Sequence, residues 1–177
     1  MRHAEAGAGQ AEATRRPAVG DAPVDLVIPY VDAQAPGFRE RYVAAHGHEP
    51  IPCQTRTLGE LRFALRSIEQ HLPWIRSVVL VVQDEAHVPD WIERRQLRVV
   101  PHEEFLPAEV RQPCFNPPAL FAWLYRIPGL APRYLIWSDD QIALRPLARR
   151  RFFSRRATPR CTLEFASIFR ADSPRAD

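Results

Sequence analysis

The chain contains no lysine, so all 24 of its basic residues are arginines. A P-loop, which places a lysine on nucleotide phosphates, is therefore excluded, and any phosphate site must use arginine side chains. Cysteine is scarce as well: Cys53, Cys114 and Cys161 are widely separated and none belongs to a CxxC pair. This spacing argues against a structural zinc site and against a disulfide framework.

Long apolar runs are also missing. No stretch approaches the roughly 20 apolar residues that a membrane span requires, and the amino terminus lacks the apolar segment of a secretory signal. From these absences we expect a cytoplasmic protein. Glycine is outnumbered by proline, with seven residues against 18, which favours short and stiff connections between elements.

The 177 residues suffice for one domain with a substantial core. Residues 1–23 are rich in alanine, glycine and charge, and we predict a disordered leader there. Residues 24–147 carry the apolar periodicity of a folded core. Residues 148–177 form a basic, divergent tail, and seven arginines without any acid lie between positions 145 and 160. A solvated tail and a surface that contacts phosphates or the inner face of a membrane are both compatible with this charge.

Apolar patterns predict strands that alternate with helices. The expected strands cover residues 24–32, 77–83, 97–102 and 133–138. The expected helices cover residues 37–46, 58–72, 88–96 and 117–127. This alternation predicts an α/β fold with a mainly parallel sheet flanked by helices.

The clearest helix lies between residues 58 and 72. Its apolar side chains recur at spacings of four, three and four residues, which places them on one stripe: Leu61, Leu65, Ile68 and Leu72. Thr57 is the expected N-cap, with Glu60 completing a capping box, and Pro73 ends the helix.

Polar side chains stand at the ends of three predicted strands. Asp32 closes the first, His102 the third, and Asp139 with Asp140 follow the fourth, which reads as a buried strand. Ligands of parallel sheets bind beyond the carboxyl ends of the strands. Adjacent carboxylates repel each other unless a cation lies beside them, so two interpretations stay open: a solvated turn, or a site for Mg²⁺ or Mn²⁺.

Several segments together resemble the Stealth family of sugar-phosphate transferases. They occur in the family's order and approximate spacing from Asp25 to Asp140, and more loosely to Phe153, which covers conserved regions 1 and 2 only. The segments are "DLVIPYVDAQAP", "GELRFALRSIEQHLPWIRSVVLVVQ", "VPDW", "LRVVPHEEFLP", "CFNPPAL" and "RIPGLAPRYLIWSDD".

The resemblance implies an incomplete nucleotide-diphospho-sugar transferase core of the GT-A-like type. It implies transfer of a hexose 1-phosphate from a nucleotide-diphosphate sugar, with UDP-sugars favoured, to a hydroxyl of a glycan acceptor in capsular or exopolysaccharide synthesis. We expect no nucleic-acid partner, and nothing in the sequence indicates an oligomeric state.

Matching the family motifs residue by residue assigns a set of candidate site residues. Asp32 and His102 are the expected catalytic residues, with His102 as a general base. Asp139 and Asp140 are the expected metal ligands. The expected substrate-binding residues are Glu60, Arg62, Arg66, Asn116 and Arg126. Arg62 and Arg66 lie one helical turn apart and could clamp a phosphate, although a solvated helix face explains them equally well.

The chain departs from the family pattern at several polar positions. Ala35 replaces a second acid of the first motif, Phe121 and Trp123 replace a glutamate and a histidine, and Ser138 replaces an asparagine. Thr57, Leu58 and Gly59 stand where an aspartate commonly precedes the helix, and residues 162–177 resemble no later family motif. Three hypotheses are therefore open: a metal-dependent sugar-phosphate transferase, a glycosyltransferase on the same fold, and a non-catalytic relative that binds a partner or an anionic surface.

Overall fold

The computed structural model describes residues 22–153 except residues 96 and 111. Within this part of the chain, four strands form one sheet: β1 (Val24–Pro29), β2 (Ser77–Val82), β3 (Arg98–Pro101) and β4 (Arg133–Ile136). The leader 1–23 lies almost wholly outside the described residues, as does the part of the basic tail from residue 154.

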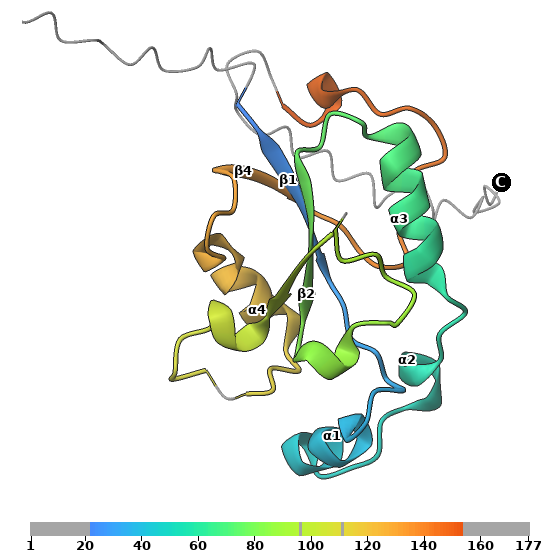
Figure 1. Ribbon diagram of the computed structural model, residues 1–177. Coiled ribbons are helices and arrows are strands. Elements are labelled where there is room, and N and C mark those ends of the chain that lie inside the picture. The colour runs from blue at the N-terminus through green and yellow to red at the C-terminus, as the bar shows by residue number, and fades with distance from the viewer. Residues whose placement is uncertain (1–21, 96, 111, 154–177) are drawn as a thin grey trace, which may run out of the picture.

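The strands are ordered β3-β2-β1-β4, and every neighbouring pair is parallel (Figure 1). Val27 on β1 lies opposite Val79 on β2 and Ile136 on β4. The prediction of an α/β fold with a parallel sheet is therefore confirmed. Because all strands run the same way, their carboxyl ends meet at one edge of the sheet.

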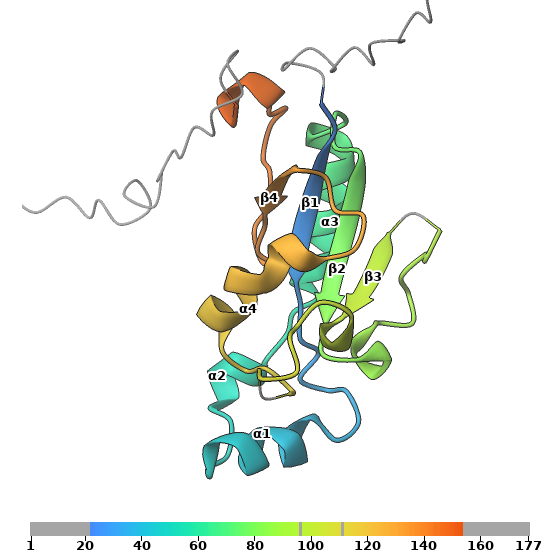
Figure 2. The same ribbon diagram turned by 90° about the vertical axis from the view of Figure 1, so that its left-hand side faces the viewer.

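Helices flank the sheet on its two faces. The connection from β1 to β2 contains α1 (Phe38–His46), α2 (Pro52–Thr55) and α3 (Glu60–His71). The connection from β3 to β4 contains the 3₁₀ turn η2 (His102–Glu104), α4 (Pro117–Trp123) and the 3₁₀ turn η3 (Leu124–Arg126). Figure 2 shows α3 on one side of the sheet and α4 on the other, with α1 beyond the carboxyl end of β1.

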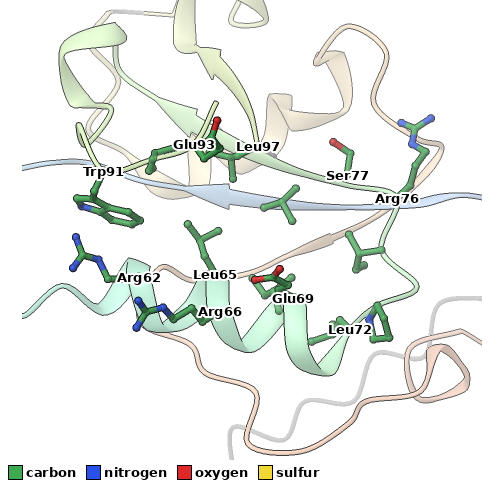
Figure 3. Close-up of a pocket in the computed structure, with 15 residues that line it drawn as sticks. Arg62, Leu65, Arg66, Glu69, Leu72, Arg76, Ser77, Trp91, Glu93 and Leu97 are labelled. Carbon is green, nitrogen blue, oxygen red and sulfur yellow. The ribbon is translucent and has the colours of Figure 1, made fainter. Parts of the chain in front are cut away.

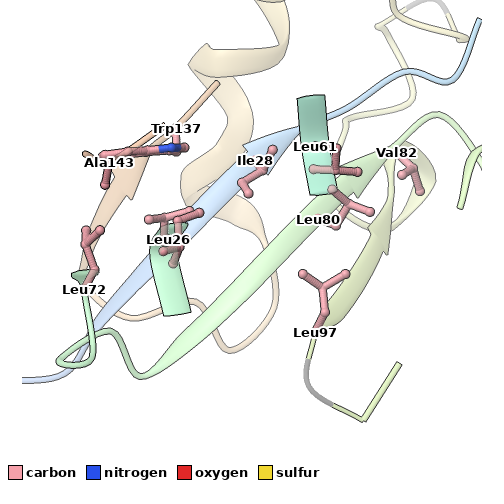
Figure 4. Packing of buried hydrophobic residues seen from close by; sticks show 10 residues of the cluster. Leu26, Ile28, Leu61, Leu72, Leu80, Val82, Leu97, Trp137 and Ala143 are labelled. Atoms are coloured by element: carbon pink, nitrogen blue, oxygen red, sulfur yellow. The ribbon is translucent and has the colours of Figure 1, made fainter. Parts of the chain in front are cut away.

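Two apolar clusters result from the alternation of side chains along the strands. Leu26 and Ile28 of β1 face α3, whereas Val27 faces α4. The cluster on the α3 side, shown in Figure 4, comprises Leu26, Ile28, Leu61, Ile68, Leu72, Leu80, Val82, Leu97, Trp137 and Ala143. The cluster on the α4 side comprises Val27, Val79, Val81, Val100, Phe105, Leu106, Cys114, Leu120, Leu124 and Ile127. The central strands are covered on both faces, as their continuous apolar sequences predict.

The predicted helix over residues 88–96 is wrong. The described residues of the connection from β2 to β3, which exclude residue 96, form the 3₁₀ turn η1 (Glu85–His87) and further turns. Asp84 caps η1 by accepting a hydrogen bond from the Ala86 N–H at 2.9 Å, and Val88 follows in extended conformation ahead of Pro89. Within these described residues, no crossover helix covers β3 on the α3 side.

Two local predictions need correction as well. The N-cap of α3 is Gly59, in the left-handed region with φ +82°, and not Thr57. The Thr57 hydroxyl donates to the Glu60 carboxylate at 2.9 Å, so the two side chains meet without forming a capping box. The fourth strand, expected to be buried, is an edge strand, and its Ile136 is 44% exposed.

The amino-terminal edge of the sheet carries a buried carboxylate. Asp25 on β1 is 1% exposed and accepts two hydrogen bonds from Arg76, at 2.8 and 2.5 Å. The Ala131 N–H donates a third at 2.8 Å. This pairing ties β1 to the chain just before β2 and just before β4.

The chain beyond β4 returns to the same amino-terminal edge. The Leu147 N–H donates to the His71 carbonyl at 2.9 Å, and the Trp74 indole donates to the Leu147 carbonyl at 2.6 Å. Phe152, next to the 3₁₀ turn η4 (Arg149–Arg151), lies 5.7 Å from Trp74 between ring centroids. Among the described residues, no helix is long and apolar enough to cross a membrane.

Candidate functional site

All four strands lead into polar residues at the carboxyl edge of the sheet. Asp32 follows β1, Gln83 and Asp84 follow β2, His102 follows β3, and Asp139 follows β4. Parallel pairing brings these strand ends together, because Val82 lies opposite Pro101 and Val27 opposite Ile136. The edge is therefore the natural place for a ligand site.

Three of the predicted site residues, Asp32, Asp139 and Glu60, lie close enough to Tyr30 for their charges to act on its phenol. Burial raises the pKa of Tyr30 to about 12, and nearby carboxylates add to the shift. In decreasing order of effect these carboxylates belong to Asp32, Asp139 and Glu60. The structure thus brings together acids that lie 28 and 79 residues apart in sequence, counted from Asp32 to Glu60 and from Glu60 to Asp139.

Asp139 and Asp140 share one hydroxyl donor. The Ser138 hydroxyl lies 3.4 Å from an Asp139 oxygen and also donates to Asp140. Burial raises the pKa of Asp139, and the charge of Asp140 raises it further. The negative charge at this corner is therefore not fully compensated, which suits a cation. Among the described residues, however, no three His, Cys, Asp or Glu side chains could hold a metal ion by themselves.

Glu60 is fixed by its own helix terminus. Its carboxylate accepts hydrogen bonds from the Leu58 N–H at 2.8 Å and from the Thr57 hydroxyl at 2.9 Å. Hydrogen bonds from its own N–H, from Leu58 and from Thr57 lower the pKa of Glu60. The sequence prediction that Glu60 binds substrate stays a prediction, because these bonds also explain the residue as a helix-start feature.

His102 is brought to the edge but is enclosed there. Its side chain is 1% exposed, and its ring packs edge-on against Phe105 at 6.1 Å. Burial, with a smaller effect of the neighbouring His87, lowers the pKa of His102 to about 4. The imidazole is then neutral at pH 7 but is a weak proton acceptor, so the role of general base stays a prediction that burial works against.

Asp32 is held by a histidine that sequence reasoning missed. The Asp32 N–H donates to Nδ1 of His87 at 3.1 Å, and the Asp32 carboxylate accepts from the Gln34 N–H at 2.8 Å. His87 is completely buried, and burial lowers its pKa. The buried imidazole therefore fixes the backbone that carries Asp32.

Arg62 and Arg66 are among the residues that line a separate cleft of about 700 Å³ on the α3 side of the sheet (Figure 3). The Arg62 guanidinium lies over the Trp91 ring, 4.7 Å from its centroid. Leu65 and Leu97 are apolar lining residues of this cleft, and Trp91 and Ile92 of the turn-rich connection from β2 to β3 line it as well. No described contact joins either arginine to the acids around Tyr30.

Asn116 and Arg126 have local structural partners. Asn116 is the N-cap of α4 and accepts a hydrogen bond from the Ala119 N–H at 3.3 Å. The Arg126 guanidinium lies 5.6 Å from the ring centroid of Trp123. Among the described residues, these partners hold neither side chain against the acids at the edge, so their substrate-binding roles stay predictions.

The residues directly after β2 are polar, as they are after the other strands, but they are absent from the predicted site. Gln83 and Asp84 follow an apolar strand in the same way as Asp32, His102 and Asp139, so the same rule applied to β2 would have included them. His87 and Tyr30 offered no such signal, because only the fold brings them against Asp32.

A parallel sheet with carboxylates gathered at its carboxyl edge defines an α/β protein with a polar ligand site at that edge. Comparison with known proteins then gives the family. Residues 54–161 match the family model described as Stealth protein CR2, conserved region 2. The chain belongs to the Stealth family.

Curated relatives carry transferase names. The chain is 32% identical over 138 residues to the exopolysaccharide phosphotransferase CpsY of Mycobacterium leprae, which covers 74% of this chain and 25% of that protein. It is 34% identical over 146 residues to the exopolysaccharide phosphotransferase SCO6021 of Streptomyces coelicolor, covering 78% and 26% of the two chains. For SCO6023 of the same organism the identity is 32% over 161 residues, covering 88% and 27%. The chain thus spans about a quarter of the length of these relatives.

Proposed function

We propose that this chain forms the donor-binding part of a sugar-phosphate transferase of exopolysaccharide synthesis. The reaction would move a hexose 1-phosphate from a nucleotide-diphosphate sugar, such as a UDP-sugar, to a sugar hydroxyl. The main support is that Asp32 and Asp139 follow strands at the carboxyl edge and that their charges, with that of Glu60, act on Tyr30 there. The names of the relatives, exopolysaccharide phosphotransferases, support the same reaction class.

Asp139 and Asp140 would hold Mg²⁺ or Mn²⁺ in this site. Their carboxylate oxygens are the ligands these ions prefer, and the raised pKa of Asp139 marks a place where a cation relieves repulsion. When bound, the ion would neutralise the charge of the diphosphate and orient it. Two aspartates leave positions for phosphate and water oxygens, as is usual for Mg²⁺.

The chain's own residues would bind and orient the donor. Phosphoryl transfer depends on positioning and charge neutralisation more than on covalent chemistry. Asp32, fixed through its backbone by His87, stands at the edge where it can accept a hydrogen bond from a sugar hydroxyl. The acceptor oxygen would attack the phosphorus that bears the sugar and its proton would pass to water. The bond between the two phosphates would break, and the nucleoside monophosphate would leave.

Calorimetry with the full chain tests donor binding. We expect UDP-glucose or UDP-N-acetylglucosamine to bind only with Mn²⁺ or Mg²⁺ present. Asp140→Ala should weaken this binding at least about tenfold, since loss of a metal-site group typically costs 10- to 100-fold. Asp90→Ala, an exposed acid in the turn after η1, is the matched control and should leave the affinity unchanged. Failure of the wild-type chain to bind either nucleotide sugar at any metal concentration would refute the proposal.

Product analysis separates transfer of sugar phosphate from transfer of sugar alone. Mass spectrometry of the acceptor would show an added hexose phosphate in the first case and an added hexose in the second. A chain that binds donor but yields neither product would be a non-catalytic relative. Phe121, 42% exposed where the family has a polar residue, is the observation in favour of this alternative.

A further inference from the structure

Buried polar atoms without a partner concentrate at the carboxyl edge of the sheet. Among the described residues, five buried side-chain nitrogen or oxygen atoms lack a hydrogen-bond partner. Four of them belong to three residues at this edge: Nε of Arg41, Nε2 and Oε1 of Gln83, and Nδ1 of His102. Burying a polar group without a partner is unfavourable, so several such groups at one edge call for a ligand or a functional reason.

Gln83 and His102 are neighbours at the carboxyl edge. Val82 pairs with Pro101, so Gln83 and His102 are the next residues along β2 and β3. Arg41 of helix α1 contacts the connection after β2, because its Nη2 lies 3.0 Å from Nε2 of His87. Gln83 is 6% exposed and His102 1%, whereas the Arg41 side chain is 32% exposed. Arg41 is therefore the member of this group that solvent and a ligand can reach.

Arg41 faces a donor where it needs an acceptor. The Asp32 N–H donates to Nδ1 of His87, so the proton of the neutral ring lies on Nε2. Nε2 therefore points an N–H at the guanidinium of Arg41, which can only donate. The nearest carboxylate, that of Asp84, lies 3.5 Å from Nη2, beyond the usual range for N–H···O bonds.

The neighbourhood of Arg41 favours a phosphate group as the missing acceptor. A guanidinium matches phosphate oxygens with a planar pair of N–H groups, and this chain has no lysine to take that role. Arg41 lies on α1, directly after the loop that carries Asp32 out of β1, at the edge where ligands of parallel sheets bind. An anion there would give Nη2 an acceptor and relieve its contact with Nε2 of His87.

We propose that Arg41 binds a phosphate of the substrate's diphosphate group, in competition with Asp84. This inference deepens the proposed function and rests on it for the identity of the ligand. Arg41 was not among the residues indicated by the sequence. It would give the site a cationic side opposite the acids around Tyr30.

Calorimetry of the full chain with inorganic pyrophosphate, without added metal, tests the inference apart from catalysis. Arg41→Gln should weaken pyrophosphate binding at least about tenfold, because a hydrogen bond to a charged group contributes about 1.5–3 kcal/mol. Arg41→Lys keeps the charge but loses the planar pair of N–H groups, so its affinity for pyrophosphate should lie between those of the wild type and Arg41→Gln. Arg39→Gln is the matched control: it lies on the same helix, is 69% exposed and pairs with Glu49. Equal effects of Arg41→Gln and Arg39→Gln would overturn the inference.

Asp84→Asn gives a test in the opposite direction. Asparagine keeps the capping bond to the Ala86 N–H but removes the competing charge, so pyrophosphate should bind a few-fold more tightly. If Arg41 served only a structural ion pair, Asp84→Asn would leave pyrophosphate binding unchanged, which counts against the inference. Thermal denaturation of each variant shows whether it is folded. If Arg41→Gln is unfolded, the binding of pyrophosphate to Arg41→Lys is compared with that to the wild type instead.

Four ligands identify the source of the phosphate. UDP and pyrophosphate should depend on Arg41, uridine should not, and inorganic phosphate should bind more weakly than pyrophosphate. If UDP-sugar binding needs Asp140 but not Arg41, the proposed function stands and this inference falls. If pyrophosphate needs Arg41 but no UDP-sugar binds under any condition, the anion site stands and the proposed donor falls.

Discussion

The carboxylates at the two ends of strand β1 differ in their hydrogen-bond partners. At the amino-terminal edge, Asp25 is buried and accepts hydrogen bonds from Arg76 and from the Ala131 N–H. At the carboxyl edge, Asp32 lies among other acids, and the polar atoms of Arg41 and Gln83 nearby lack partners. At the amino-terminal edge the buried carboxylate has its hydrogen-bond partners, and this pairing stabilises the fold. At the carboxyl edge, charges and polar atoms lack partners within the protein, which is what a ligand site requires.

The largest effect on stability is expected from Asp25, at the amino-terminal edge of the sheet. Asp25→Ala removes both bonds to Arg76 and leaves the Ala131 N–H without its acceptor, so the free energy of unfolding should fall by about 2–4 kcal/mol. Urea denaturation of the full chain measures this loss. Asp140→Asn, an exposed carboxylate, is the control and should change stability by less than about 0.5 kcal/mol. A loss at Asp25 no larger than the control's would break the comparison.

A smaller effect is expected from the enclosed histidine at the carboxyl edge. The pKa of His102 is lowered from its ordinary value of 6.5 to about 4. Below pH 6.5 the unfolded chain binds a proton that the folded chain does not, so stability should fall as the pH drops from 6.5 towards 4. The loss that depends on His102 should be on the order of 2–3 kcal/mol at pH 4.

Urea denaturation of His102→Gln and the wild type at several pH values checks this contribution. The variant should lose less stability between pH 7 and pH 4 than the wild type does. His46→Gln, which alters an exposed histidine of α1, should keep the slope of the wild type. Parallel slopes for His102→Gln and the wild type would show that His102 takes up its proton in the folded state.

The smallest effect has the opposite sign to that at Asp25. Burial and the charge of Asp140 raise the pKa of Asp139, so the folded state binds its proton more tightly than the unfolded state and stability falls as the pH rises through this range. Asp139→Asn should therefore raise the free energy of unfolding, by less than about 1 kcal/mol because the site is partly solvated. The difference from the wild type should grow between pH 4 and pH 7 in urea denaturation without metal. Destabilisation by Asp139→Asn would contradict the view that this corner carries uncompensated charge.

The sheet and its direction could be predicted from the sequence because the signals were local. Continuous apolar runs such as 77–82 fit strands buried on both faces, and the stripe of Leu61, Ile68 and Leu72 fits a helix on one face. The turn-rich connection after β2 was mistaken for a helix. Its 88–96 segment has a favourable proline near its start, and Val88 and Ile92 pack against the α3-side cluster, but the described residues do so from turns and not from a helix.

Part of the candidate site was also predictable. Asp32, His102 and Asp139 follow apolar strands, and strand direction alone places them at one edge. Gln83 and Asp84 obey the same rule. His87 and Arg41 do not, since each acts through a partner 55 or 46 residues away, a separation that leaves no periodic trace.

The sequence by itself determined the α/β alternation and the strand ends that carry acids, because both depend on residue order along single elements. The tertiary structure alone decided which of those ends are satisfied. In the tertiary structure His102 is buried and Asp25 pairs with Arg76. Arg62 lines a separate cleft, and Arg41 contacts His87. The reason is that burial and partner distance depend on contacts between elements far apart in the chain.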